Sequence, residues 1–132
     1  MPNQGKASSY SATMGGMLSV ISGSVPDFQT AACWVVITNG KLVFVSNTGS
    51  ASISSYQLSG GGALSLIEAV AGSTGAGSAP IDMALSNNSR FLYVTDNGLQ
   101  MVHSFAVGKD GTLTPIDNDG GLPFGVQGIA AK

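Results

Sequence analysis

Two stretches of this sequence are near copies of each other, and this internal repetition constrains the fold more than any other feature. KLVFVSNTG at residues 41–49 returns as RFLYVTDNG at residues 90–98. The aromatic residues Tyr10, Tyr56 and Phe105 fall in one register with spacings of 46 and 49 residues, and the segments after them match as well. Repeats of this period are typical of solenoids, propellers and other arrays of one supersecondary unit.

Each complete repeat contains four short segments rich in β-branched and aromatic residues, which favour strands. Turns such as TNGK, NNSR, SGGGA and GKDGT separate them, with Gly or Asn expected to supply positive φ. No segment shows an apolar period of 3.6 residues over a useful length, so we expect almost no helix. The expected strands are 34–37, 42–46, 53–58 and 64–69, followed by 81–85, 91–95, 101–107 and 113–117.

Four antiparallel strands in a repeat of this length are typical of a β-propeller blade, and we predict an all-β fold of this class. A β-sandwich is the alternative, because it also combines short strands at similar spacing. The predicted units are a half blade at 7–22 with strands three and four, two complete blades at 29–71 and 79–118, and a lone inner strand at 123–131.

The predicted strands are too few to close a ring, because propellers need about four to eight blades of four strands. An open wedge exposes sheet edges and inter-blade faces, and both favour association. One hypothesis is a head-to-tail homodimer, in which the last strand of one chain joins the first two strands of the next and the ring has about six blades. The other is that the chain is part of a longer propeller, and the sequence leaves both open.

The composition bears on partners and compartment. Only 9% of the residues are charged, the net charge is −2 and the five basic residues are scattered, which argues against a nucleic-acid surface. The apolar run CWVVI is far too short to span a bilayer, so no membrane association is expected. MPNQGKASSYS lacks the apolar core of a signal peptide, whereas low charge with abundant Ser, Thr and Gly leans towards an extracellular or periplasmic protein.

The segment at residues 80–117 carries a family resemblance. It contains a proline, then SNNSR before FLYVTDN, then a strand that ends in an aromatic residue, and finally KDGTLT. These features resemble one blade of the lactonase family of seven-bladed propellers, which is related to the YVTN surface-repeat proteins. The resemblance extends from Ala7 to Ala131 and implies a lactone hydrolase similar to 6-phosphogluconolactonases, or a relative of muconate cyclases.

In that family a histidine often follows the proline, at the inner end of strand one, and faces the central channel. Here the position holds Asp82, while Cys33 or Trp34 stands there in the repeat before and Gly125 in the repeat after. The function implied by the resemblance is hydrolysis of a small lactone of the sugar-acid type. A ligand-binding propeller module and a non-catalytic, self-assembling repeat are the alternatives.

Several polar residues are expected in loops at one face of the propeller. The loop before strand one and the loop between strands two and three open on the same face, so we expect Asp82 and Asp96 to share the channel mouth with Asn97, Asn47 and Asp27. Two carboxylates can activate water at a lactone carbonyl, and such oxygen groups bind polar ligands or Ca²⁺. No cofactor is otherwise predicted, and the alternative is that these side chains satisfy turn backbones.

Four further residues have distinct expectations. His103, the single histidine, is a candidate general base, with a hydrogen-bonded histidine inside a blade as the alternative. Trp34 is a candidate ligand contact. Cys33 is expected to be buried and inert, because no cation or helix N-terminus lies near it to lower its pKa. Arg90, at the opposite turn, is expected to be structural, and one Cys with one His provides no zinc spacing.

Overall fold

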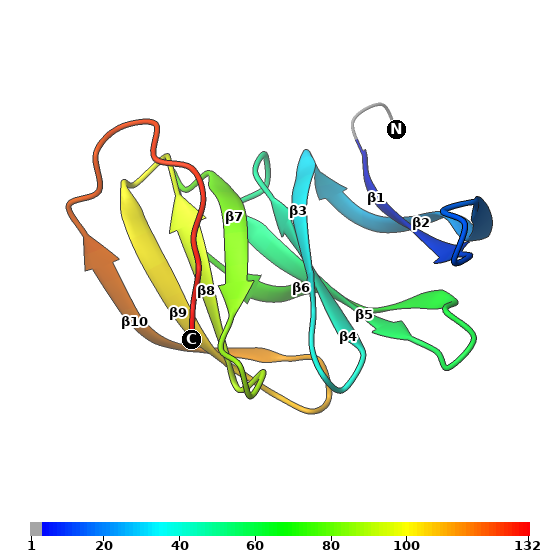
Figure 1. Cartoon of the computed structure of the whole chain (residues 1–132). Coiled ribbons are helices and arrows are strands. Elements are labelled where there is room, and N and C mark those ends of the chain that lie inside the picture. The colour runs from blue at the N-terminus through cyan, green and yellow to red at the C-terminus, as the bar shows by residue number, and fades with distance from the viewer. Residues whose placement is uncertain (1–3) are drawn as a thin grey trace.

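A computed structural model describes residues 4–132, in which the chain forms ten strands and no helix. The strands build three antiparallel sheets in chain order (Figure 1). The first sheet has two strands, β1 (Gln4–Ala12) and β2 (Leu18–Thr30). The second has β3 (Ala32–Ile37), β4 (Leu42–Asn47), β5 (Ser52–Leu58) and β6 (Leu64–Ser73), and the third has β7 (Pro80–Leu85), β8 (Phe91–Asp96), β9 (Met101–Val107) and β10 (Leu113–Gly120).

The second and third sheets are four-stranded meanders with neighbouring strands hydrogen-bonded in sequence order, as in a propeller blade. Their registers are equivalent, because Asn47 pairs with Ala32 in one sheet and Asp96 pairs with Pro80 in the other. The prediction of an incomplete all-β propeller is therefore confirmed. A two-layer sandwich is excluded, because the middle sheet packs against a sheet on each side.

The two cores lie between consecutive sheets. The larger one joins the second and third sheets through residues such as Phe44, Ile53, Leu92 and Phe105. The smaller one joins the first and second sheets around Tyr56 and residues of β4. Alternate residues of β4 point to opposite faces, so the whole strand is buried. Each fully buried large apolar side chain contributes about 1.5–3 kcal/mol of transfer free energy.

The turns between strands one and two differ from expectation in one detail. Positive φ is supplied by Lys41 and Ser89 rather than by Gly or Asn. In both turns the hydroxyl of the residue directly after the first strand, Thr38 or Ser86, accepts a hydrogen bond from the N–H that begins the next strand. In each turn the residue with positive φ is the third one after Thr38 or Ser86. In SGGGA and GKDGT, glycines have positive φ as expected.

The predicted lone strand near the C-terminus is not formed within this chain. Residues 121–132 carry no strand and run beside the third sheet, close to β7 (Figure 1). A strand needs a hydrogen-bonded neighbour, and no described segment supplies one here. The first sheet, by contrast, is longer than predicted, because β1 offers partners as far as Gln4, which pairs with Thr30.

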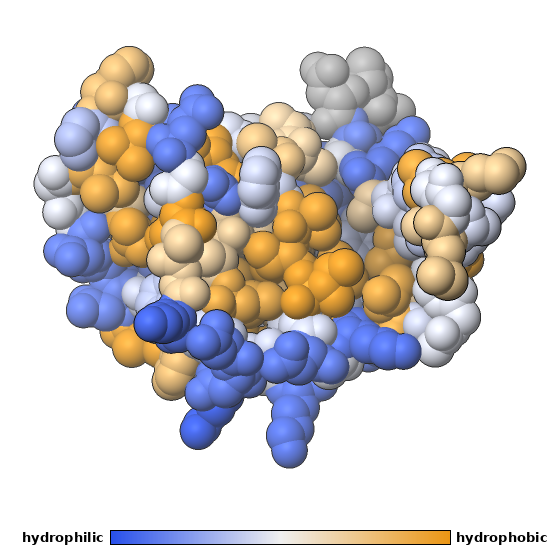
Figure 2. Space-filling model, in the orientation of Figure 1, coloured by the Kyte–Doolittle hydropathy of each residue, from blue (hydrophilic) through white to orange (hydrophobic). Residues whose placement is uncertain are grey.

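Apolar side chains remain exposed both on the innermost strand β3 and on the outer sheets. Figure 2 shows hydrophobic residues across the centre of one face and hydrophilic residues along its lower edge. The expectation of a buried Cys33 is wrong, because this residue is exposed on β3, an innermost strand that no further sheet covers. Since the described residues contain no helix, none of them provides a helical membrane span. The exposed large side chains include Tyr10, Met17, Leu18, Val20, Phe28, Trp34, Val35, Ile37, Ile116 and Phe124.

Candidate functional site

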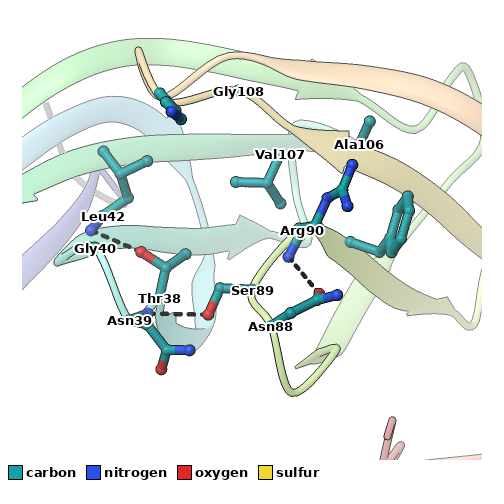
Figure 3. A pocket seen from close by; sticks show the side chains of 12 residues that line it. Thr38, Asn39, Gly40, Leu42, Asn88, Ser89, Arg90, Ala106, Val107 and Gly108 are labelled. Atoms are coloured by element: carbon teal, nitrogen blue, oxygen red, sulfur yellow. Dashed lines mark hydrogen bonds between the residues drawn. The ribbon is translucent and has the colours of Figure 1, made fainter.

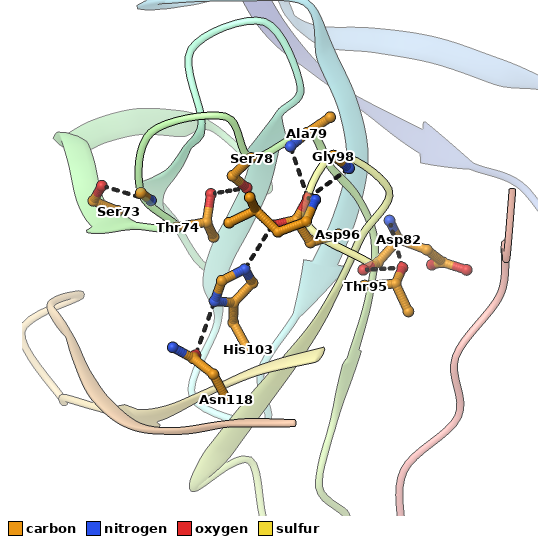
Figure 4. Close-up of polar contacts among 12 residues, drawn as sticks. Ser73, Thr74, Ser78, Ala79, Asp82, Thr95, Asp96, Gly98, His103 and Asn118 are labelled. Carbon is orange, nitrogen blue, oxygen red and sulfur yellow. Dashed lines mark hydrogen bonds and ion pairs between the residues drawn. The ribbon is translucent and has the colours of Figure 1, made fainter. Parts of the chain in front are cut away.

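Asp82 lies on β7, the innermost strand of the third sheet. Its backbone N–H donates to the hydroxyl of Thr95, which in turn donates to the Asp82 carbonyl. Its carboxylate Oδ1 accepts a hydrogen bond of 2.8 Å from the Met83 N–H. The side chain is half-buried and points towards the C-terminal segment (Figure 4), where a Cβ atom added at Gly128 would lie 3.8 Å from Oδ2. Innermost strands line the channel of a propeller, so Asp82 presents a carboxylate oxygen on the channel side.

Trp34 occupies the equivalent position in the second sheet. The backbone N–H of Trp34 donates to the hydroxyl of Ser46, as the backbone N–H of Asp82 does to the hydroxyl of Thr95. The Ser46 hydroxyl donates to the carbonyl of Ile81, so it ties β4 to β7 of the next blade. With a relative exposure of 49%, the indole is accessible beside Asp82's strand. An aromatic face and a carboxylate thus stand at matching places on two adjacent innermost strands.

Asp96 ends β8 and is completely buried. Its Oδ1 accepts hydrogen bonds from the N–H groups of Ala79, Gly98 and Leu99, at 2.8, 2.8 and 3.1 Å. Burial opposes ionisation, but the hydrogen bonds from His103 and from these backbone groups outweigh it, so the pKa of Asp96 lies below its ordinary value. Asp96 is therefore an ionised carboxylate that joins the β8–β9 loop to the segment before β7.

His103 on β9 completes this buried network. Its Nε2 donates to Asp96 Oδ2 at 2.8 Å, and its Nδ1 lies 2.9 Å from Asn118 Oδ1 on β10 (Figure 4). With a relative exposure of 3%, the ring is closed off from solvent. Asn118 was missed by the sequence analysis, although the antiparallel register of the third and fourth strands places it opposite His103.

The two carboxylates expected to act together do not form a pair. Figure 4 shows Asp96 directed towards His103 and the Ser78–Ala79 backbone, while the Asp82 carboxylate points to the C-terminal segment. Asn97, in the β8–β9 loop, donates its N–H to the Ala79 carbonyl and is half-buried. Of this group, Asp82 is the residue with a free carboxylate oxygen near the surface.

Asn47 and Asp27 lie inside the molecule. Asn47, equivalent to Asp96, is fully buried and donates from Nδ2 to the hydroxyls of Ser54 and Ser52. Asp27 is fully buried in β2, where its Oδ1 accepts from the Gln29 N–H at 2.8 Å. Both are out of reach of a ligand at the channel mouth. Among residues 4–132, no group of three or more His, Cys, Asp or Glu side chains is placed to hold a metal ion.

Comparisons with known proteins agree with this architecture. The family model described as Lactonase, 7-bladed beta-propeller matches residues 7–127. No curated protein matches the sequence. Among solved structures, a protein from Lactobacillus plantarum is similar at 24% identity with a TM-score of 0.71, covering 87% of this chain and 35% of its own.

Two further solved structures carry names that refer to lactones. A proposed 6-phosphogluconolactonase from Bacteroides uniformis has 21% identity and a TM-score of 0.68, with 89% of this chain and 37% of its own covered. The periplasmic gluconolactonase of Pseudomonas aeruginosa has 19% identity and a TM-score of 0.72. The match covers 92% of this chain and 37% of the gluconolactonase. At these identities the likeness shows the fold. The chain spans little more than a third of the length of these proteins.

Proposed function

Because this chain belongs to the Lactonase, 7-bladed beta-propeller family, we propose that it takes part in the hydrolysis of a small lactone of the sugar-acid type. The observation that carries the proposal is the family match over residues 7–127, which spans both complete blades. The names of two solved structures of the same fold, a 6-phosphogluconolactonase and a gluconolactonase, support the class of substrate. The active form is the one in which further blades surround the channel.

In this proposal Asp82 is the general base. Its Oδ1 is held by the Met83 N–H, which fixes the carboxylate, while Oδ2 is free to accept a proton from water. The water oxygen bonds to the lactone carbonyl carbon as its proton passes to Asp82. The ring C–O bond then breaks, and Asp82 returns the proton to the leaving alkoxide. The product is the open hydroxy acid.

The neighbouring residues position the base and the substrate. Asp96 accepts the Ala79 N–H and so fixes the segment that enters β7 three residues before Asp82. His103 holds Asp96 in place. Both are positioning residues in this proposal, because their polar atoms are engaged and buried. Trp34 offers the exposed aromatic face against which the substrate ring packs. Asn97, in the β8–β9 loop that is bonded to Ala79, is a further candidate contact to the substrate.

The test is hydrolysis of a panel of sugar-acid and aliphatic lactones. The reaction is monitored as the acid released at constant pH. The panel is run over a range of protein concentrations, so that monomeric and associated forms are both assayed. Asp82→Asn is expected to abolish activity, whereas Asp117→Asn, an exposed carboxylate on β10, leaves it unchanged. A parent protein without activity towards any lactone, in either form, would remove the enzymatic proposal.

A second candidate function is self-association as a structural or ligand-binding propeller module. The observation that favours it is the exposure of apolar side chains on the two outer sheets, including Val20 on β2 and Ile116 on β10. A head-to-tail homodimer would cover these faces with a second copy. Sedimentation velocity tests it: a dimer is expected, weakened by Val20→Glu on β2 but not by Met14→Glu at the β1–β2 turn tip. A monomer at all concentrations contradicts it.

A further inference from the structure

A pocket lies between the second and third sheets, at the ends of the strands opposite the loops that carry Asp96 and Asn97. It is formed by the turns between β3 and β4, between β7 and β8, and between β9 and β10. Its volume is about 540 Å³, which suits a small organic molecule. Both walls belong to described residues of this chain, so the pocket is present whatever covers the open sides of the wedge.

The inner surface of the pocket is apolar and its rim is polar. Leu42, Phe91 and Val107 contribute aliphatic and aromatic surface from three different strands or strand ends. Figure 3 shows the side chain of Arg90 beside Val107 and Ala106. The hydrophilic residues along the lower edge of Figure 2 lie where these turns are in Figure 1. A ligand that fits this lining has an apolar body and a polar end.

The rim carries positive charge that has no partner within the described chain. Arg90 and Lys109 both line the pocket, and Lys41 follows its lining residue Gly40. Among residues 4–132 the one ion pair is that between His103 and Asp96, so these cations contact no carboxylate. Asp110, the acidic residue of the same turn, instead accepts hydrogen bonds from the hydroxyl and N–H of Thr112.

Further hydrogen-bond donors face the same space. Asn88 Oδ1 accepts from the Arg90 N–H and the Ser86 hydroxyl, which leaves the Asn88 amide N–H₂ group to donate outwards. The Ser89 hydroxyl accepts from the Asn39 N–H, so its own hydrogen remains free (Figure 3). Cations and neutral donors thus gather at one side of an apolar pocket.

We propose that this pocket binds a small organic anion, with its carboxylate held by Arg90 and Lys109 and its apolar body against Leu42, Phe91 and Val107. The planar guanidinium of Arg matches a carboxylate with two parallel hydrogen bonds. Binding is independent of lactone hydrolysis, because the pocket lies beyond the C-terminal end of β7 whereas Asp82 lies in the N-terminal half of that strand.

The experiment is a titration of the ¹⁵N-labelled protein with phenylacetate, in which binding is monitored by the amide chemical shifts. Calorimetry measures the affinity. Shifts are expected at Gly40, Ser89 and Gly108, which line the pocket. Arg90→Gln is expected to weaken binding about tenfold or more, because a charge-assisted hydrogen-bond pair is lost. Lys6→Gln removes an exposed lysine elsewhere and leaves affinity unchanged. Arg90 is exposed, so circular dichroism of the variant is expected to match the parent.

Two further probes decide the ligand class. Phenylacetamide has the same body without the charge, and inorganic phosphate has charge without the body, so both are expected to bind at least tenfold more weakly than phenylacetate. Equal binding of phenylacetamide would show that the cations do not select an anion. Equal binding of phosphate would show that the apolar lining plays no part. Either result, or shifts confined to other residues, overturns the proposal.

Discussion

At the scale of single residues, equivalent positions in the two blades solve the same problem with different chemistry. Asp96 and His103 in the third sheet correspond to Asn47 and Ser54 in the second, and each pair is buried and hydrogen-bonded. In the third sheet Asp96 Oδ1 also accepts three backbone N–H groups, whereas in the second sheet Ser54 links the pair to the Ala69 carbonyl. The blade therefore needs a satisfied polar pair here, of either kind.

This equivalence predicts a non-additive response to substitution. Asp96→Asn alone is expected to lower the free energy of unfolding by about 3 kcal/mol, because it removes a buried carboxylate whose Oδ2 accepts a hydrogen bond from His103. His103→Ser is expected to cost less in the Asp96→Asn background than in the parent, with a coupling of about 1–2 kcal/mol, because the double variant recreates the pair of the other blade. Urea denaturation of the four proteins measures this. Strictly additive values would show that the two side chains act independently.

The lowered pKa of Asp96 gives a dependence of stability on pH. A carboxyl group whose pKa is lower in the folded than in the unfolded state contributes stability above its unfolded pKa, near 3.8, and loses it as pH falls through the folded pKa. We expect the free energy of unfolding to fall below about pH 4 and to fall less steeply in Asp96→Asn. Urea midpoints from pH 3 to pH 6 provide the check. Asp119→Asn is the control, since that carboxylate is exposed on β10 and its removal is expected to change the slope less.

Gly5 has a steric role that follows from its neighbour. A Cβ atom at Gly5 would lie 2.5 Å from Asp27 Oδ1 and 2.7 Å from its Oδ2, and Asp27 is fully buried. Gly5→Ala is therefore expected to lower the free energy of unfolding by about 1–3 kcal/mol. Gly60→Ala, where nothing lies within 4 Å of the added methyl group, is expected to have little effect. Thermal unfolding that ranks the two variants equally would contradict this reading of the contact.

At the scale of elements, the turns show what local sequence can and cannot specify. The positions of TNGK and NNSR were predictable from composition, but their left-handed residues were not. Hydroxyl caps at Thr38 and Ser86 close each turn on the following strand, and the geometry then assigns positive φ to Lys41 and Ser89. A side-chain to backbone bond thus overrides the intrinsic preference of glycine.

Lys41 consequently carries backbone strain that glycine would not. A left-handed conformation costs an L-residue roughly 1–2 kcal/mol. Glycine avoids this cost, but its unfolded state is more flexible, so part of the gain in stability is lost. Lys41→Gly is expected to raise the free energy of unfolding by up to about 1 kcal/mol. Lys41→Ala, which removes the side chain and keeps the strain, is the matched control and is expected to be neutral. Destabilisation by Lys41→Gly would show that the lysine side chain matters more than its φ.

The candidate site shows the same limit at the level of strand pairing. The position of Asp82 after the proline and its equivalence to Trp34 followed from the repeat, and the register agrees with it. The burial of Asp96 and Asp27 did not, because it depends on which face of a strand each side chain occupies. Register shifts within β1–β2 and within β7–β8 affect that, and they have no clear local signal.

At the scale of the whole molecule, the fold was predictable because the blade is a local meander. All pairings within the second and third sheets join neighbours in sequence, so a repeated pattern of strands and turns specifies them. The C-terminal strand was not predictable in the same way, since a lone strand depends on a partner that is distant or on another chain. The half blade of β1 and β2 forms because its two strands pair with each other.

The state of residues 123–131 is therefore a reporter of association. In the isolated chain this segment carries no strand, so its amides are expected to exchange hydrogen rapidly, in contrast to those of β4 and β8, which are paired on both sides. If a second copy or further blades supply a neighbouring strand, the same amides become protected at high protein concentration. Hydrogen exchange read by mass spectrometry across a dilution series measures this. Exchange of 123–131 that remains fast while sedimentation reports a dimer would place the contact elsewhere on the wedge.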